Sequence, residues 1–391
     1  MINESSNFTA AAPLDDDYRY YFDDYWNVTA DHPELTRVVE FLDTYYLPTI
    51  IGIGLIGNTV SFVVFVSTYL NRLSLSVYLA ALSVADAGFL CALAVGWLEY
   101  AGIALFHTNG WCQATVYATY VFSFLSAWFV VSFTVERYIA ICHPLKRPEM
   151  CTVARARCVV CGLSAFALAS YSCTLKFSGV KRVGPYTLCH SVDEYNGLMR
   201  ALTYVDTLVT FIVPFAAIFA FNVRIFHKIS YFYSKKDGGR LAADSPYEYC
   251  TTAHHRHYAA TKICLRNRAQ IKVTKFLLLI STVFLVINLP SYVIRIMAFL
   301  HNIMAQDNTR LDILLQQLFQ FIFYTNFSIN FFLYSLCSKK FRTALFRLGW
   351  QMKYKVTNFV RQSYRLLLGS SNNNTLEQDV GQQPGIEPFP K

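Results

Sequence analysis

The fold is decided by the stretch Trp111–Lys146, which reads WCQATVYATYVFSFLSAWFVVSFTVERYIAICHPLK. Almost no charge occurs in it until its last third. As an α-helix rising about 1.5 Å per residue, the part from Cys112 to Arg137 measures roughly 37 Å, enough to span a hydrocarbon core of about 30 Å. At about 100° per residue, its polar residues form one stripe: Cys112, Thr119, Ser126 and Arg137. Because such a stripe must face protein or water rather than lipid, the sequence predicts a central membrane helix.

The end of this stretch carries a family resemblance. Glu136-Arg137-Tyr138, followed by ICHPL at 141–145, resembles the inner end of the third transmembrane helix of rhodopsin-like (class A) G-protein-coupled receptors. The family usually has Asp-Arg-Tyr, and Glu136 keeps the charge. The resemblance implies an all-α membrane protein, a bundle of seven transmembrane helices. It also implies that Arg137 is held by Glu136 at rest and meets the G protein when the receptor opens.

Composition excludes several other classes. The chain has 391 residues, of which 54% are hydrophobic and 15% charged, which is too apolar for an ordinary soluble domain. The 11 cysteines lie mostly inside apolar blocks, so a disulfide scaffold is not expected. The formal charge of +9 comes from cations in loops between apolar helices, so we expect no nucleic-acid partner.

Apolar segments of spanning length predict seven crossings. They are 44–69, 74–100, 112–142, 153–175, 198–231, 271–300 and 311–337. Lys and Arg gather in the third inner loop region, 224–275, and after residue 338, whereas residues 1–43 hold ten acidic residues and two arginines. By the positive-inside rule the N-terminus is extracellular and the C-terminus cytoplasmic, in a multi-pass protein of the plasma membrane.

Four regions follow from this pattern. They are an acidic extracellular tail (1–43), the receptor domain (44–337), an amphipathic juxtamembrane helix on the inner leaflet (338–368) and a disordered cytoplasmic tail (369–391). The first tail has no apolar region typical of a cleavable signal peptide. It carries three glycosylation sequons, at Asn3, Asn7 and Asn27. Its Tyr/Asp cluster at 15–26 could attract a basic ligand or simply be a solvated tail.

Two cysteines are expected to be bonded. The predicted topology places Cys112, at the outer end of the third helix, and Cys189, in the loop after the fourth, in the oxidising extracellular compartment. The loop 176–191 has glycine and proline spaced as in a hairpin. In the resembled family this bridge ties a hairpin over the ligand pocket.

Asp86 is a carboxylate near the middle of an apolar span, where it needs partners. The polar cluster that it forms with other helices matches the sodium site of the family's inactive state: Asp86, Ser126, Asn326 and Asn330. Oxygen ligands suit a hard cation, but a helix-packing network without an ion explains these residues equally well. We expect no cofactor other than this sodium ion. The histidine run at 254–257 lacks the spacing of a zinc site, and a solvated loop explains it better.

Two helices depart from the family pattern. Asn330-Phe331-Phe332-Leu333-Tyr334 stands where the family usually has Asn-Pro-x-x-Tyr, and Ile287-Asn288-Leu289-Pro290 where it has Cys-Trp-x-Pro. Pro290 still kinks its helix, but the usual tryptophan toggle is absent. These variants resemble invertebrate neuropeptide receptors of the FMRFamide-receptor type. The resemblance implies that coupling to the G protein involves the following residues: Glu136, Arg137, Tyr138, Pro290, Asn330 and Tyr334.

The candidate ligand site combines acids, an arginine and aromatic residues. Thr119 and Tyr120 stand where amine receptors carry aspartate, so an amine ligand is not expected. Residues 276–338 contain no lysine, so a retinal Schiff base cannot form there. Asp206 is an uncompensated acid, and Glu99 faces the pocket only if its helix bulges; a place in the headgroups explains each charge equally well. The candidates are Trp97, Glu99, Tyr100, Thr119, Tyr120, Ser123, Asp206, Asn288, Tyr292, Arg295, Gln316 and Gln320.

These features predict a receptor for a short amidated neuropeptide that activates heterotrimeric G proteins in the lipid bilayer of the cell surface. The resemblance adds arrestin as a partner. A chemosensory receptor for a non-peptide small molecule is the main alternative. A transporter or channel is disfavoured because no internal repeat or interrupted helix pair is seen. No catalytic constellation is found, so the sequence does not predict an enzyme.

Overall fold

The computed structural model describes residues 33–183, 186–237, 257–303 and 310–368. The sequons at Asn3, Asn7 and Asn27, residues 254–256 of the histidine run and the tail 369–391 lie outside the described residues. The chain divides after Phe341 into two units, of which the first holds the helix bundle.

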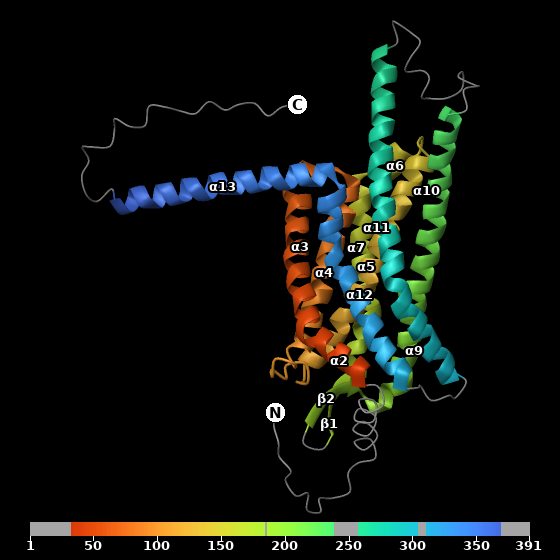
Figure 1. Cartoon of the computed structure of the whole chain (residues 1–391), viewed down its shortest axis with the longest axis vertical. Helices are drawn as coiled ribbons and strands as arrows, with labels where there is room; N and C mark the ends of the chain where they lie inside the picture. Colours follow the sequence, from red (N-terminus) through yellow and green to blue (C-terminus); the bar gives the residue numbers. More distant parts are fainter. Residues whose placement is uncertain (1–32, 184–185, 238–256, 304–309, 369–391) are drawn as a thin grey trace, which may run out of the picture. The chain divides into compact units, whose positions relative to one another are not determined.

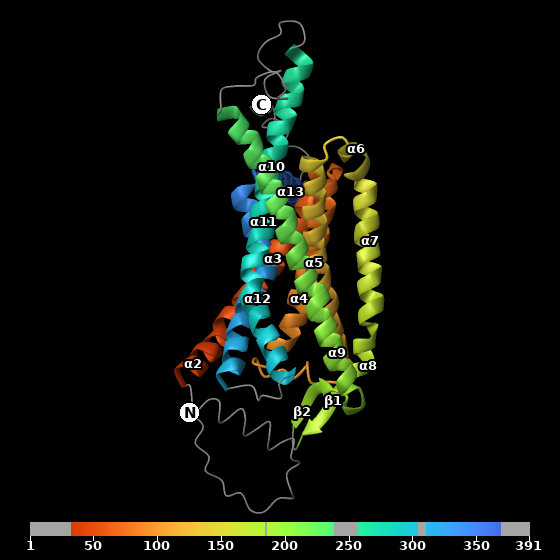
Figure 2. The ribbon, with the colours of Figure 1, turned by 90° about the vertical axis from the view of Figure 1, so that its right-hand side faces the viewer.

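Seven helical segments of the first unit run side by side as a bundle (Figures 1 and 2). The first segment consists of α2 (Pro33–Phe41), the π-helical turn η1 (Leu42–Tyr46) and α3 (Leu47–Ser67). The next are α4 (Ser74–Trp97), α5 (Trp111–Cys142) and α7 (Val153–Ser170), which continues through η3 (Tyr171–Cys173) into α8 (Thr174–Phe177). The fifth is α9 (Asn196–Thr207), the π-helical turn η5 (Leu208–Ile212) and α10 (Val213–Asp237). The last two are α11 (His257–Ile303) and α12 (Arg310–Cys337).

The predicted all-α bundle of seven segments is confirmed. Among the described residues, six of these segments are long and apolar enough to cross a membrane by length and composition alone. The seventh, α12, is not one of the six, because glutamine, asparagine and serine interrupt its apolar residues. α5 is central, since it packs against α4, α7, α10 and α11.

Short elements join the helices. η2 (Tyr69–Arg72) and α6 (Arg147–Met150) lie in two of the connections, and η4 (Asp193–Tyr195) precedes α9. The strands β1 (Ser178–Val183) and β2 (Tyr186–Ser191) form an antiparallel pair in the connection between α8 and α9. This pair is the hairpin that the glycine and proline spacing predicted.

Close approach of the helices depends on small residues. A Cβ atom placed on Gly57 of α3 would lie 2.8 Å from the Cβ of Phe331 on α12. Small residues let membrane helices approach closely enough for packing to replace the hydrophobic drive that lipid cannot supply. α3 and α12 are therefore held at a separation that only glycine permits at this position.

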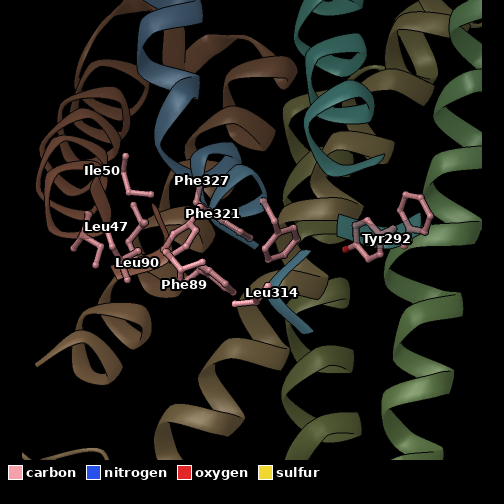
Figure 3. Close-up of a cluster of buried hydrophobic side chains, with 12 residues drawn as sticks. Leu47, Ile50, Phe89, Leu90, Tyr292, Leu314, Phe321 and Phe327 are labelled. Carbon is pink, nitrogen blue, oxygen red and sulfur yellow. The ribbon is translucent and has the colours of Figure 1, made fainter. Parts of the chain in front are cut away.

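A series of aromatic rings in contact, which we call the ring chain, crosses the middle of the bundle (Figure 3). Phe211 of η5 stacks on Tyr292 of α11, with ring centroids 3.7 Å apart. Tyr292 meets Phe323 of α12 edge to face, Phe323 meets Phe327 in the same way, and Phe327 stacks on Phe89 of α4 at 3.8 Å. Such contacts add to the stabilisation from burial alone and fix the relative positions of four helices.

Pro290 lies inside α11, and the helix changes direction along its length in both views (Figures 1 and 2). Proline removes one backbone donor and pushes its ring against the preceding turn, so a bend is the expected consequence.

The second unit holds most of α13 (Lys339–Leu368). The helix is amphipathic, as the sequence predicted for residues 338–368. Its apolar side chains Phe346, Trp350 and Phe359 are exposed in the isolated chain. Apolar side chains beside many cations are typical of a helix lying on an anionic membrane surface, which stays a prediction.

Candidate functional site

A cavity with a volume of about 740 Å³ lies among α4, α5, α9, α11 and α12. Its floor includes Phe89 and Phe323 from the ring chain. Seven of the residues that the sequence named as ligand contacts line it: Thr119, Tyr120, Ser123, Asp206, Arg295, Gln316 and Gln320. We call it the main cavity.

Asp206 is buried and hydrogen-bonded, but no described residue forms an ion pair with it. The hydroxyl of Tyr171 donates to its Oδ1 at 2.5 Å, and the hydroxyl of Thr210 donates to the same oxygen at 2.7 Å. Oδ2 accepts no hydrogen bond from the described residues. One carboxylate oxygen therefore fixes the side chain, and the other is left for a group in the main cavity.

Arg295 is held by an amide and two aromatic rings. Its Nη2 donates to Oε1 of Gln320 at 3.1 Å, and its guanidinium carbon lies 5.6 Å and 5.5 Å from the ring centres of Tyr292 and Phe323. No carboxylate of the described residues forms an ion pair with it. A cation over ring faces is attracted by their quadrupoles, but its charge remains open to an anionic or carbonyl ligand group.

Five predicted ligand contacts do not line the main cavity, and three of these line neither it nor the smaller cavity beside it. Tyr292 is 4% exposed and packs in the ring chain, and Asn288 is buried with its amide donating to the carbonyl of Phe284. Glu99 follows the end of α4, and its carboxylate contacts Nε2 of His107 at 2.8 Å. These residues share helical faces with cavity residues but lie at other depths or beyond the helix end.

A smaller cavity of about 340 Å³ adjoins the main one, and Thr119 and Gln320 line both. It contains the predicted contacts Trp97 and Tyr100. It also contains Asp43, which the sequence assigned only to the acidic tail. No sequence signal separated Asp43 from the other acidic residues of that tail.

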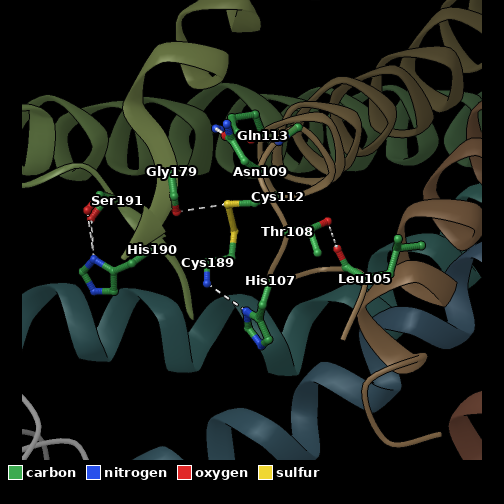
Figure 4. Close-up of a disulfide and its surroundings, with 11 residues drawn as sticks. Leu105, His107, Thr108, Asn109, Cys112, Gln113, Gly179, Cys189, His190 and Ser191 are labelled. Atoms are coloured by element: carbon green, nitrogen blue, oxygen red, sulfur yellow. Dashed lines mark hydrogen bonds between the residues drawn. A yellow bond between two sulfur atoms is a disulfide. The ribbon is translucent and has the colours of Figure 1, made fainter. Parts of the chain in front are cut away.

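A disulfide joins Cys112 to Cys189, as expected (Figure 4). Cys189 lies on β2 opposite Val180 of β1, so the bond ties the hairpin to the N-terminal end of α5. The backbone N–H of Cys189 also donates to Nδ1 of His107 at 2.8 Å. The hairpin is thus attached to the bundle at two neighbouring points.

Asp86 on α4 is completely buried and hydrogen-bonded on both oxygens. Ser126 donates to Oδ1 and the amide nitrogen of Asn330 donates to Oδ2, each at 2.7 Å. Of the predicted cluster, Asn326 is buried but makes no hydrogen bond to Asp86 among the described residues. Asn58 of α3 donates to the carbonyl of Phe327, and its own Oδ1 has no partner in the described part of the chain.

The C-terminal end of α5 shows the predicted ion pair. Nη2 of Arg137 donates to Oε1 of Glu136, and the hydroxyl of Ser74 on α4 donates to the same oxygen at 2.8 Å. Both charged side chains are buried, and Nε of Arg137 has no partner in the described part of the chain. Removing either partner would leave a buried charge uncompensated, which costs free energy.

Two tyrosines of the predicted coupling set lie in aromatic surroundings. The ring of Tyr138 is 5.0 Å from that of Phe221 on α10. Tyr334 on α12 is fully buried, with its ring 5.3 Å from Phe65 and 5.6 Å from Phe341. Asn330 donates to Asp86, as described above, so one residue of this set belongs to the buried polar cluster.

Sequence reasoning missed the residues that position the candidates. Tyr171 and Thr210 hold Asp206, and Thr203 bonds the hydroxyl of Tyr120 at 3.0 Å. They are ordinary polar residues in apolar helices, and only the packing of α7, α9 and η5 brings them to the site.

Comparison with known proteins agrees with this geometry. The model of the 7 transmembrane receptor (rhodopsin family) matches residues 57–334. The mouse thyrotropin-releasing hormone receptor is 27% identical over 376 residues, which cover 90% of this chain and 92% of that receptor. The match to the chicken thyrotropin-releasing hormone receptor is 31% over 156 residues, 38% of this chain and 36% of that receptor.

The mouse cysteinyl leukotriene receptor 1 is 27% identical over 175 residues, covering 42% of this chain and 48% of that receptor. The matched segments thus span less than half of the chicken and leukotriene receptors and nearly all of the mouse hormone receptor. These relatives do not point specifically to the FMRFamide-receptor type. The chain is a multi-pass membrane protein and no enzyme, and it belongs to the rhodopsin family of seven-transmembrane receptors.

Proposed function

We propose that the chain is a plasma-membrane receptor that binds a short amidated peptide in the main cavity and activates heterotrimeric G proteins. One observation carries the ligand class. Asp206 and Arg295 line the same cavity, and neither forms an ion pair with any described residue. A peptide carries both a cationic group and carbonyl or amide groups, so one molecule can satisfy both side chains.

The walls of the main cavity favour the same class. Gln316 and Gln320 offer amides, and Thr119, Tyr120 and Ser123 offer hydroxyls. Hydrogen-bonding groups placed in a mostly apolar cavity provide orientation and specificity. A volume of about 740 Å³ lies within the usual range of roughly 300–1,000 Å³ for ligand pockets, so a few residues of a peptide fit.

The arrangement of the chain in the membrane is part of this proposal. The acidic region 1–43 is extracellular and the basic regions after residue 338 cytoplasmic, so the main cavity opens outward and the Glu136–Arg137 pair faces the G protein and arrestin. Residues 44–337 form the receptor domain, 338–368 the membrane-surface helix and 369–391 a cytoplasmic tail. Glycosylation of Asn3, Asn7 and Asn27 fits this orientation.

The test is a second-messenger assay on cells that express the full chain, against a panel of short peptides made both as amides and as free acids. At least one amidated peptide with a basic residue should activate the cells. Cells that express Arg137→Ala at equal surface density serve as the silent control. Activation by non-peptide compounds alone would contradict the peptide assignment.

A second candidate is a chemosensory receptor for a small acidic molecule. It is favoured by the single uncompensated cation, Arg295, in a mostly apolar cavity, and by the similarity to cysteinyl leukotriene receptor 1. An acid that pairs with Arg295 would leave Asp206 without a ligand partner. Asp206→Asn should then leave its potency unchanged, whereas a basic peptide should lose potency.

We also propose that Asp86 supports a sodium-sensitive resting state. The fit is partial: Asp86 and Ser126 offer oxygen ligands, and Asn58 Oδ1 is a buried oxygen without a partner among the described residues. Asn330 presents its nitrogen, so it steadies the carboxylate rather than serving as a ligand here.

Sodium should lower the affinity for an agonist, because an ion that binds the resting state shifts the equilibrium towards it. Asp86→Asn should abolish that dependence. The measurement is agonist affinity in sodium chloride and in N-methylglucamine chloride at equal ionic strength. An unchanged dependence in the variant would leave the packing network as the only role of the cluster.

A further inference from the structure

The smaller cavity, which we call the side cavity, combines one carboxylate with an aromatic wall. Asp43 is the only carboxylate among its lining residues in the described part of the chain, and no Lys, Arg or His is among them. The rings around it come from α4, the loop after α4, and α12: Trp97, Tyr100, Phe106, Phe321 and Tyr324. The Asp43 carboxylate belongs neither to the family motifs nor to the G-protein coupling residues described above.

The local backbone aims Asp43 at the bundle. Asp43 lies in the π-helical turn η1, and such turns occur frequently at functional sites. Its Oδ2 accepts from the hydroxyl of Tyr100 at 3.1 Å, and its backbone carbonyl accepts from Nε1 of Trp97 at 3.0 Å. Trp97 at the end of α4 and Tyr100 in the loop after it thus fix both the main chain and the side chain of Asp43.

Within the described part of the chain, the negative charge of Asp43 has no ionic partner. No Lys, Arg or His of the described residues forms an ion pair with it, and Oδ1 accepts no hydrogen bond from them. A cation in this cavity would be attracted by the carboxylate through its charge and by the aromatic rings through their quadrupoles.

The kind of cation follows from the donors. Ca²⁺ needs six or more oxygen ligands and Mg²⁺ needs near-octahedral oxygens, and aromatic rings supply neither. An ammonium or guanidinium group, in contrast, can bond the carboxylate while its carbon framework packs on the rings.

We propose that the side cavity is a cation subsite for the amine or the basic side chain of a peptide whose remainder lies in the main cavity. The two cavities share Leu93, Thr119, Gln320 and Tyr324, so one extended ligand can occupy both. The identity of the ligand as a peptide rests on the proposed function; the cation preference of the subsite does not.

The preference can be measured without knowing the ligand, by the labelling of introduced cysteines in the full chain in membranes. Gln317→Cys places a thiol in the side cavity only, and Thr207→Cys places one in the main cavity only. Each is labelled with trimethylammonioethyl methanethiosulfonate, a cation, and with sulfonatoethyl methanethiosulfonate, an anion. The chain without an introduced cysteine gives the background of its native thiols.

Asp43→Asn should lower the ratio of cation to anion labelling rates at Gln317→Cys by about three- to fivefold, the effect of one nearby charge in a wet site. The ratio at Thr207→Cys should stay unchanged. An unchanged ratio at Gln317→Cys, or an equal fall at both positions, would overturn the subsite.

A second measurement leaves Asp43 in place and so does not depend on how an Asp43 variant folds. Nα-acetylarginine amide should slow the labelling of Gln317→Cys by uncharged methyl methanethiosulfonate more than Nα-acetylcitrulline amide, its neutral counterpart, does. Equal protection by the two amides would also overturn the proposal. Labelling does not require signalling. If the cation preference is found but no peptide activates the cells, the proposed function is refuted and the cation subsite is not.

Discussion

Replacing Arg137 with alanine is expected to abolish most G-protein activation while leaving ligand binding intact. Arg137 lies near the C-terminal end of α5, and its only hydrogen-bond partner among the described residues is Glu136. Hydrogen bonds to charged groups are worth about 1.5–3 kcal/mol, so losing those that the arginine makes to the G protein should reduce nucleotide exchange by about 10- to 100-fold. Binding and exchange should be measured on the same membranes.

Glu136→Gln provides the opposite test of the same pair. Because it removes the charge that holds Arg137 at rest, signalling without ligand should rise. Ser74→Ala is the matched control, since it removes the other hydrogen bond to the same carboxylate oxygen and leaves the ion pair in place. Its basal signalling should rise less than that of Glu136→Gln. Full exchange by Arg137→Ala would mean that this receptor does not use its arginine for coupling.

Arg295→Gln is expected to cause the largest loss of peptide potency. The substitution keeps a polar side chain beside Gln320 but removes the unpaired cation of the main cavity. A lost charge-assisted hydrogen bond of about 1.5–3 kcal/mol corresponds to a fall of about 10- to 100-fold. Arg295→Lys should recover only part of it, because an ammonium lacks the planar fork that bonds two acceptors at once.

Asp206→Asn tests whether the charge of Asp206 binds the basic group of the peptide. Its amide oxygen can still accept from Tyr171 and Thr210, so the local packing survives while the charge is lost. Potency should fall for peptides with a basic group and stay unchanged for neutral peptides. The readout is a dose–response series with each peptide and its neutral analogue. Equal losses for both peptides would show that Asp206 acts through structure rather than charge.

The sequence predicted the bundle well because long apolar segments leave few alternatives in a membrane. It also predicted the Cys112–Cys189 bond and the Glu136–Arg137 contact, the first from topology and chemistry and the second from a short motif. These features depend on residue type and order along the chain.

Depth and local backbone geometry were harder to predict. Asn288, Tyr292 and Arg295 share one face of α11, but only Arg295 reaches the main cavity, because the deeper part of that face packs against η5 and α12. Helical periodicity gives the direction of a side chain and says nothing about where a cavity begins.

The π-helical turns were the second source of error. η1 contains Asp43, and η5 begins two residues after Asp206. A π-helical turn is wider than an α-helical turn, so the faces of residues beyond it are shifted from those that 100° per residue assigns. Both carboxylates that line the cavities lie at such turns, which is why their surroundings could not be inferred from the sequence.

The imidazole ring of His107 links the hairpin to Glu99 through both of its nitrogens. Nδ1 of the ring accepts the N–H of Cys189, so a proton on Nε2, pointing at Glu99, completes the neutral tautomer that suits both neighbours. The loop after α4 therefore orients β2 through a single side chain, which accepts from the backbone of the strand on one nitrogen and contacts the Glu99 carboxylate with the other.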